Sequence, residues 1–566
     1  MSMRISRRNL IKAGMISAAS LSACSDNRPV LSLPTTKAKQ PNILLVVTDQ
    51  ERAIDNLPKE VSLPARNYLA QRGVSFPKAQ VVSSICSVSR GTLYTGQHPQ
   101  HNNVWENTPL PYASNLSKTI PTLGTMMQDL GYTTAYFGKW HLSKLPMDET
   151  VGFQEMSSML ASYGFEVSDQ DRELDGALEG HRYDPATTAS AQNFIRRNKQ
   201  SDKPWFASVN LVNPHDIMFF AVNEKQRASR WGKFPSSLES APELPAYQQK
   251  FNAPLDATFA QENWASRPSN HKSYADIISG VLGELDWTDT AAWQRFQDYY
   301  FNCLQDVDTN ITALCDTLTA TDSWENTIVV FTSDHGEMLG AHHLRDKGPV
   351  MYKECNNVPM IVVHPEGQAN QTSPSLTSHI DIAPTLLEFA GLDSLAINKH
   401  YPQLKGHSFA SAMKSPAKTS ARNAALYQWS SMVYLDPSFA KTSQTILDKP
   451  QATDILSKFS QGKLSLDLFQ RGHLRGIFDG RYKFGRYFSP RLYRQHYSFE
   501  QLITECDLEL YDTVNDRAES NNLATNIEEH RTLIIDLNSK LEALITTEIG
   551  TDIGGHLPGP TLFWQA

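Results

Sequence analysis

Four apolar runs, each followed at once by polar residues, constrain the fold of this chain more than any other feature. They span residues 43–47, 133–137, 206–212 and 328–331. Continuous apolar runs of this length are typical of strands buried on both faces of a parallel sheet. Helical patterns lie between them, such as residues 63–72, which end at Gly73. This alternation predicts an α/β fold built on a doubly wound, mostly parallel sheet.

Each of the four runs leads to a side chain that can do chemistry. Asp49, Lys139, His215 and Asp334 follow the successive runs within a few residues. Ligands bind outside the carboxyl ends of the strands in doubly wound sheets. We therefore expect these four side chains to meet at one rim of the sheet and to form the active site.

Two pairs of residues at this rim are suited to a metal ion. Asp49 with Gln50, and Asp334 with His335, supply carboxylate and amide oxygens together with one imidazole. Hard divalent cations prefer oxygen ligands, and the imidazole also admits softer metals. These pairs predict a site for one divalent cation, with Ca²⁺ as the first choice and Mg²⁺ or Mn²⁺ as alternatives.

The predicted catalytic α/β domain covers residues 41–403. Within it, residues 217–306 have weak periodicity and are expected to form insertions over the active-site rim, where specificity often lies. Residues 404–566 are predicted to form a smaller α+β subdomain with an antiparallel sheet. A hairpin that turns at Asp479-Gly480 and a helix over residues 527–546 indicate this subdomain.

The first 40 residues are typical of a targeting segment rather than of the fold. Residues 6–12 are similar to a twin-arginine export motif, and residues 21–24 look like a bacterial lipobox that ends at Cys24. We expect a signal peptide over residues 1–23, lipidation of Cys24, and a tether over residues 24–40. The protein would then leave the cytoplasm through the twin-arginine machinery. It would face the periplasm or reside at the outer membrane of a Gram-negative bacterium, touching membrane only through its lipid anchor.

The net charge indicates which classes of partner to expect, and the cysteine spacing bears on possible disulfides. The formal net charge is −8, and no nucleic-acid-binding module is visible, so nucleic acid is not expected as a partner. An anionic substrate would have to be met by a local basic pocket. The six cysteines show no CxxC spacing, and the sequence leaves any disulfide pairing open.

The segment Cys86-Ser87-Val88-Ser89-Arg90 resembles the signature of type I sulfatases. In that family the cysteine is oxidised to formylglycine (3-oxoalanine) by a formylglycine-generating enzyme, and the hydrated aldehyde is the nucleophile. The usual pattern has Pro or Ala at the position of Val88. Further segments resemble the family in the same order along the chain: Asp49-Gln50, Gly138-Lys139-Trp140-His141, Asn213-Pro214-His215, Ser333-Asp334-His335-Gly336, Lys347 and Glu509-Leu510-Tyr511-Asp512.

The resemblance implies an alkaline phosphatase-like fold and a hydrolase of sulfate esters, with a carbohydrate sulfate or a small sulfate ester as the substrate. It also assigns roles to residues of this chain. Cys86 would become the formylglycine nucleophile, and Arg90 would hold the turn that bears it. Lys139 and His141 would contact the nucleophile, and His215 and Lys347 would bind sulfate oxygens. The metal ligands would be Asp49, Gln50, Asp334 and His335.

Two alternatives remain open at this stage. The Asp49-Gln50 pair, together with His335, is also similar to phosphonate monoester and phosphodiester hydrolases of the same superfamily. If Val88 prevents oxidation of Cys86, the chain would instead be a lipid-anchored protein that binds sulfated glycans without cleaving them.

Overall fold

The computed structural model describes residues 40–53, 58–110, 112–145, 151–233, 236–417, 422–447 and 465–555. The predicted signal peptide, Cys24 and all but the last residue of the predicted tether lie outside these ranges. Over the described ranges, no helix combines the length and the apolar character needed to cross a membrane.

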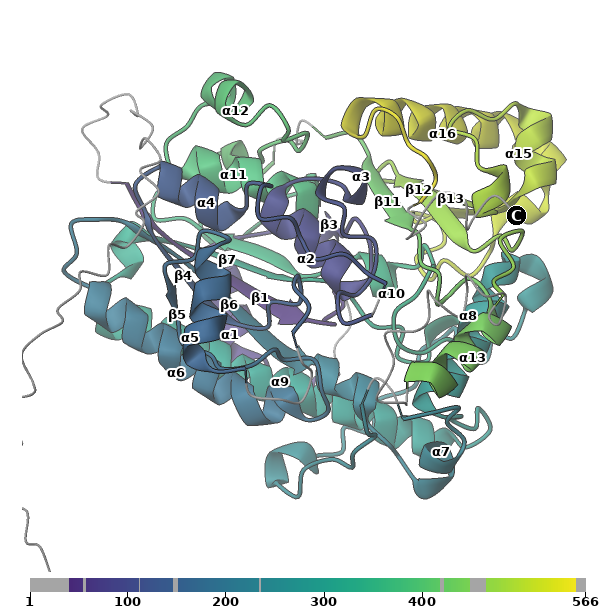
Figure 1. The fold of residues 1–566 in the computed structure, drawn as a ribbon, viewed down its shortest axis with the longest axis horizontal. Helices are drawn as coiled ribbons and strands as arrows, with labels where there is room; N and C mark the ends of the chain where they lie inside the picture. The colour runs from purple at the N-terminus through teal and green to yellow at the C-terminus, as the bar shows by residue number, and fades with distance from the viewer. Residues whose placement is uncertain are drawn as a thin grey trace, which may run out of the picture.

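An eight-stranded sheet forms the centre of the molecule (Figure 1). Its four central strands run parallel in the order β4-β6-β1-β7, and β8 joins β7 in the antiparallel direction. The four central strands are the four apolar runs of the sequence, so the prediction of a mostly parallel α/β sheet is confirmed. In spatial order the eight strands are β5 (Val167–Ser168), β4 (Thr133–Gly138), β6 (Trp205–Pro214), β1 (Asn42–Asp49), β7 (Thr327–Ser333), β8 (Met360–Val363), β2 (Val74–Ser75) and β9 (Gln371–Thr372).

Helices cover both faces of this sheet (Figure 1). Side chains alternate between the faces along β1, so that Ile43, Leu45 and Val47 enter one core while Leu44 and Val46 enter another. Burial on both faces explains why the sequence shows continuous apolar runs. The first core is completed by α2 (Cys86–Thr95), α4 (Leu123–Asp129) and α11 (Ile382–Phe389), and the second by α1 (Pro64–Arg72), α6 (Glu179–Asn198) and α9 (Thr290–Ala320).

The segment predicted as rim insertions contains more regular structure than its sequence pattern indicates. It includes α7 (Glu224–Ala228), α8 (Ser269–Leu282) and the first half of α9, so the expected boundary at residue 306 falls inside a helix. All nine side chains from Phe296 to Leu304 are buried. A helix segment buried on every side has no amphipathic stripe, which is why its periodicity is weak. The buried thiols of Cys303 and Cys315 also lie on α9.

A four-stranded antiparallel sheet forms the C-terminal region, as predicted. Its hairpin turns at Asp479-Gly480, where the left-handed backbone of Gly480 (φ 92°) suits a residue without a side chain. One face of this sheet packs under α16. In spatial order its strands are β11 (Ala425–Trp429), β12 (His473–Phe478), β13 (Tyr482–Phe488) and β14 (Cys506–Asp512), and α16 spans Ile527–Glu548.

The other face of the C-terminal sheet shares a core with the catalytic domain. Tyr427 and Trp429 pack in the same cluster as the side chains above the central sheet. A buried clamp strengthens this contact, because Arg422 bonds Asp381 at 2.7 Å and Glu548 at 2.6 Å. The remaining helices and strands are β3 (Lys78–Gln80), α3 (Pro99–Asn102), α5 (Phe153–Ala161), α10 (Lys353–Asn356), β10 (Leu376–Ser378), α12 (Ser394–His400), α13 (Pro437–Leu447) and α15 (Phe499–Glu505).

Candidate active site

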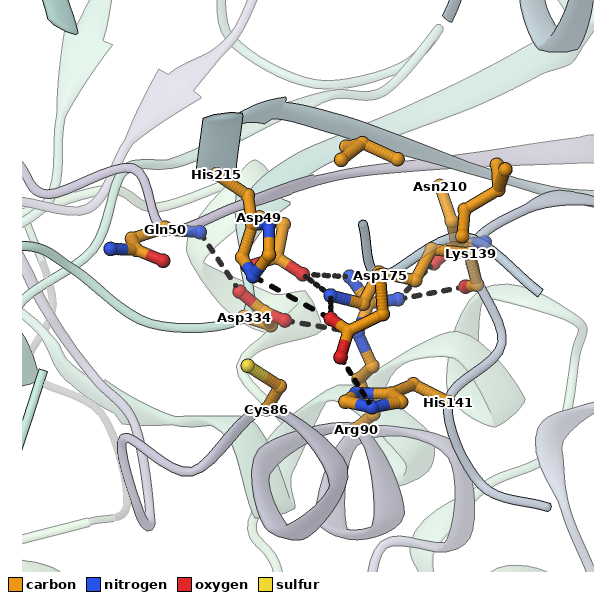
Figure 2. Close-up of polar contacts among 12 residues, drawn as sticks. Asp49, Gln50, Cys86, Arg90, Lys139, His141, Asp175, Asn210, His215 and Asp334 are labelled. Atoms are coloured by element: carbon orange, nitrogen blue, oxygen red, sulfur yellow. Dashed lines mark hydrogen bonds and ion pairs between the residues drawn. The ribbon is translucent and has the colours of Figure 1, made fainter. Parts of the chain in front are cut away.

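The carboxyl ends of four parallel strands meet at one rim of the central sheet. Asp49 ends β1, Lys139 follows β4, His215 follows β6 and Asp334 follows β7. Figure 2 shows these side chains gathered in one place, with the sulfur of Cys86 directed toward them from the start of α2. The structure therefore brings together the residues that the strand ends were expected to deliver.

A group of four residues can hold a metal ion. The ligand atoms of Asp49, Cys86, Asp334 and His335 lie within 4.8 Å of one another. The Nε2 atom of His335 lies 3.1 Å from Cys86 Sγ and 3.7 Å from one oxygen of each aspartate. Its Nδ1 atom donates to Gly336 O at 3.0 Å, which leaves the lone pair of Nε2 directed at the group. Asp49 Oδ1 is buried without a hydrogen-bond partner. This donor set fits one divalent cation.

Two buried cations hold the opposite side of the carboxylates. Arg90 donates from Nε to Asp334 Oδ2 at 2.9 Å and from Nη2 to Asp49 Oδ2 at 3.2 Å. Lys139 Nζ lies 2.8 Å from the same oxygen of Asp49. Burial by itself would raise the pKa of Asp49, but the neighbouring cations, Lys139 foremost, hold this pKa well below its ordinary value. Asp49 is therefore ionised, with one oxygen fixed and the other available to a cation.

The contacts of Gln50 differ from those expected of a metal ligand. Its side chain points away from Cys86 (Figure 2). Its Nε2 donates to Glu337 Oε2 at 2.6 Å and to Asp346 Oδ1 at 3.0 Å. Its Oε1 accepts a hydrogen bond from Lys347 Nζ at 2.7 Å. The left-handed backbone at Gln50 (φ 68°) ends the strand abruptly and aims the carboxamide at these groups. Gln50 thus supports Lys347 in this structure, and its role as a metal ligand stays a prediction.

The structure adds Asp175, which the sequence analysis missed. Its carboxylate forms an ion pair with Lys139 Nζ and lies 3.2 Å from His141 Nε2 and 3.5 Å from His215 Nε2. Burial by itself would lower the pKa of His141, but Asp175 outweighs burial and raises this pKa to about 9. Asp175 stands in the loop between the two-residue strand β5 and α6, follows none of the four apolar runs and belongs to none of the recognised motifs. Only the folded chain brings it to the rim.

His215 and Lys347 also lie in the site, and their protonation states differ. Burial, and next the charge of Lys139, hold the pKa of His215 well below its ordinary value, so the imidazole is neutral. Its Nδ1 has no hydrogen-bond partner. Burial opposes the charge on Lys347, but Asp346 foremost raises its pKa well above the ordinary value, so the ammonium stays charged. Lys347 thus contributes a fixed cation to the site, and His215 contributes a neutral imidazole.

Val88, the position that departs from the family pattern, is buried in the core above the central sheet. The neighbouring serines support the site, because Ser87 Oγ donates to His141 O at 2.6 Å and Ser89 Oγ donates to Asp334 O at 2.5 Å. The valine side chain therefore serves packing, while its neighbours tie α2 to two strand ends.

A cavity of about 90 Å³ opens beside Cys86. Asp175, His215 and Lys347 line it together with residues from α8, from the loop after α3 and from the C-terminal region. The predicted C-terminal subdomain therefore contributes directly to the wall of the active site.

The sequence and the fold can now be compared with known proteins. The chain matches the family model for sulfatases over residues 41–392 and the model for the N-sulphoglucosamine sulphohydrolase C-terminal region over residues 340–447. It is 27% identical to the uncharacterized sulfatase YidJ of Escherichia coli (strain K12) over 378 residues, which cover 63% of this chain and 69% of that protein. It is 26% identical to the N-acetylglucosamine-6-O-sulfatase of Bacteroides thetaiotaomicron over 464 residues, 73% of this chain and 77% of that protein.

The fold also matches solved structures. The phosphonate monoester hydrolase of Silicibacter pomeroyi superposes with a TM-score of 0.62 at 20% sequence identity, covering 90% of this chain and 96% of that one. Such a likeness shows the shared architecture alone. The sulfatase model, by contrast, spans more than half of the chain and includes the strand ends that surround Cys86. The chain therefore belongs to the sulfatase family and is a sulfuric ester hydrolase with an alkaline phosphatase-like fold.

Proposed function

We propose that the protein removes sulfate from a carbohydrate sulfate ester, using Cys86 after its oxidation to formylglycine and one divalent cation held beside it. The observation that carries this proposal is the position of Cys86. Its sulfur lies at the first residue of α2 and within the group formed with Asp49, Asp334 and His335. Helix N-termini favour anions. The sugar sulfatase among the relatives supports a carbohydrate as the leaving group.

The residues around Cys86 have different roles in the proposed reaction. When present, the cation stabilises negative charge and the formylglycine supplies a hydrated aldehyde as the nucleophile. Lys347, fixed by Gln50, holds sulfate oxygens with its charged ammonium. Asp175 keeps a proton on His141 up to a pH of about 9. His215 lines the same cavity as a neutral imidazole whose Nδ1 has no partner. Preorganised charges of this kind supply the largest share of catalysis in many enzymes.

Two measurements on the protein from its native host test this proposal. Mass spectrometry of the peptide that contains Cys86 should show conversion of the thiol to the aldehyde. Hydrolysis of 4-nitrophenyl sulfate should be lost in Cys86→Ala and kept in Cys506→Ala, whose buried thiol lies on β14. An unmodified thiol in all of the protein would favour the non-catalytic glycan-binding alternative. A large preference for a phosphonate monoester or phosphodiester over aryl and sugar sulfates would replace the sulfatase proposal.

The proposal also covers which metal ion the protein binds and where in the cell the protein resides. Ca²⁺ is the expected cation, and metal analysis of the purified protein distinguishes it from Mg²⁺ and Mn²⁺. The export motif and lipobox support an exported, lipid-anchored enzyme that faces the periplasm or the outer membrane. Substitution of Cys24 by Ser should move the protein from the membrane fraction to the soluble fraction. If it stays with the membrane, the anchor is elsewhere.

A further inference from the structure

The cavity beside Cys86 extends beyond the groups that contact sulfate. Sulfate is placed by Cys86 and Lys347, so the rest of the cavity must hold whatever the sulfate is attached to. The cavity is also lined by residues that belong neither to the four-residue group nor to the predicted sulfate contacts. We call five of them the leaving-group subsite: Glu106, Trp429, Tyr434, Ser443 and Gln444.

Three polar atoms of this subsite are buried and have no hydrogen-bond partner. They are Trp429 Nε1, Ser443 Oγ and Gln444 Oε1, on side chains of residues that are only 1%, 2% and 4% exposed. Such atoms are rare in folded proteins, because each forfeits the hydrogen bond that it would make in water. Together they offer a donor, a hydroxyl that can donate or accept, and an acceptor. Their residues line the cavity, and a ligand with several hydroxyl or amide groups that reached these atoms would satisfy them.

The subsite also offers apolar surface. The rings of Trp429 and Tyr434 meet edge to face, with centroids 5.3 Å apart. Ile277 and Val281 of α8 line the same cavity. Sugar rings combine an apolar face with hydroxyl groups at the edge, so this mixture of aromatic, aliphatic and unpartnered polar groups suits a sugar ring.

The charged side chains that line the cavity indicate which kind of sugar ring it can bind. Glu106 is buried in the wall, where Met432 N donates to Oε1 at 2.6 Å and Ser431 Oγ donates to Oε2 at 3.0 Å. Lys347 is the only lysine or arginine among the described residues that line the cavity, and it lies at the sulfate end. A second sulfate or a carboxylate on the ring would be buried without a cation beside it, which is costly.

We propose that the leaving-group subsite binds an uncharged sugar ring and selects monosulfated saccharides over those with a second acidic group beside the scissile ester. This proposal rests on the proposed sulfatase function and specifies the substrate class of the same site. Ser443 and Gln444 of α13 hydrogen-bond the ring hydroxyls, and Trp429 with Tyr434 contacts its apolar face.

The test compares three kinds of substrate on the full-length, matured enzyme. They are 4-nitrophenyl sulfate, a panel of N-acetylglucosamine and galactose monosulfates, and the same sugars with a second sulfate. Wild type should favour a monosulfated sugar over its disulfated counterpart in kcat/KM. Ser443→Ala and Gln444→Ala should each lower the ratio of kcat/KM for that monosulfated sugar to kcat/KM for 4-nitrophenyl sulfate by about threefold to tenfold. Ser438→Ala is the matched control, since Ser438 is exposed on the same helix and outside the cavity.

A gain of activity keeps the test independent of folding defects. Gln444→Lys adds a cation to the subsite and should raise the ratio of disulfated to monosulfated turnover by about threefold. The proposal is overturned if none of the three subsite variants changes the substrate ratio given for it above. It is also overturned if wild type prefers disulfated sugars. Turnover of 4-nitrophenyl sulfate without turnover of any monosulfated sugar also overturns it. Failure to cleave every sulfate ester would instead refute the proposed function itself.

Discussion

Glu106 should make the stability of this enzyme fall as the pH rises from 4.5 to about 7. The side chain is buried in the wall of the cavity, and burial raises its pKa from the ordinary 4.5 to about 7 despite hydrogen bonds from Met432 N and Ser431 Oγ. The folded protein therefore holds a proton at Glu106 that the unfolded chain has already lost. Stability from this group is complete below pH 4.5, declines between pH 4.5 and about 7, and stays constant above.

The size of the effect follows from the two pKa values. Each unit of difference between the folded and unfolded states corresponds to about 1.4 kcal/mol, so ionising Glu106 costs the folded state about 3 kcal/mol in total. Glu106→Gln keeps the shape of the side chain and an oxygen that can accept from Met432 N. Its Nε2 can donate to Ser431 Oγ in place of the bond that Glu106 accepts. The variant lacks the ionisation, so its advantage over wild type should grow as the pH rises.

Urea unfolding of both proteins at a series of pH values measures this difference. Between pH 5 and pH 8 the free energy of unfolding of Glu106→Gln should rise relative to wild type by about 2 to 3 kcal/mol. Glu388→Gln is the control for the loss of a carboxyl group, because Glu388 is exposed on α11. If the Glu106→Gln difference does not change with pH, the carboxyl is not held in its neutral form and the reasoning from burial is refuted.

Three further predictions concern the site and its support. Gln50→Ala should leave the metal content per chain unchanged and raise KM for sulfate esters about tenfold, because Lys347 loses a hydrogen bond from its charged group; loss of metal would support Gln50 as a ligand. Arg422→Met should lower the free energy of unfolding by about 3 to 5 kcal/mol, because two buried carboxylates lose their cation. The half-exposed Arg494→Met should cost under about 1 kcal/mol in the same urea experiment, and equal losses would contradict this account of burial. Chelation should abolish turnover of 4-nitrophenyl sulfate and readdition of Ca²⁺ should restore it, whereas full activity after verified metal removal would rule out the cation site.

Sequence patterns were sufficient to place the functional residues that come directly after a buried strand. Asp49 and Asp334 could be placed at one rim because parallel strands end at the same edge of the sheet. The same reasoning did not reveal the contact between Gln50 and Lys347. Adjacent residues at a strand end do not share a direction, and the left-handed turn at Gln50 sends its carboxamide toward Lys347. Spacing along the chain carries no information about such a turn.

Other features depend on contacts between distant segments. Asp175 lies in a loop, yet its carboxylate meets Lys139, His141 and His215. The first half of α9 escaped recognition because it is buried all round, so that its polar and apolar residues do not alternate with a helical period. In both cases the decisive neighbours come from segments far away in the sequence.

The sequence by itself determined the α/β architecture, the sulfatase resemblance and the strand ends that surround Cys86, because these depend on local apolar patterns and short motifs. Only the tertiary structure decided that Gln50 supports Lys347, that Asp175 sets the charge of His141, and that the C-terminal region supplies part of the cavity wall. The physical reason is that ionisation and hydrogen bonding depend on distances of a few ångströms between atoms. Such distances exist only once the chain has packed.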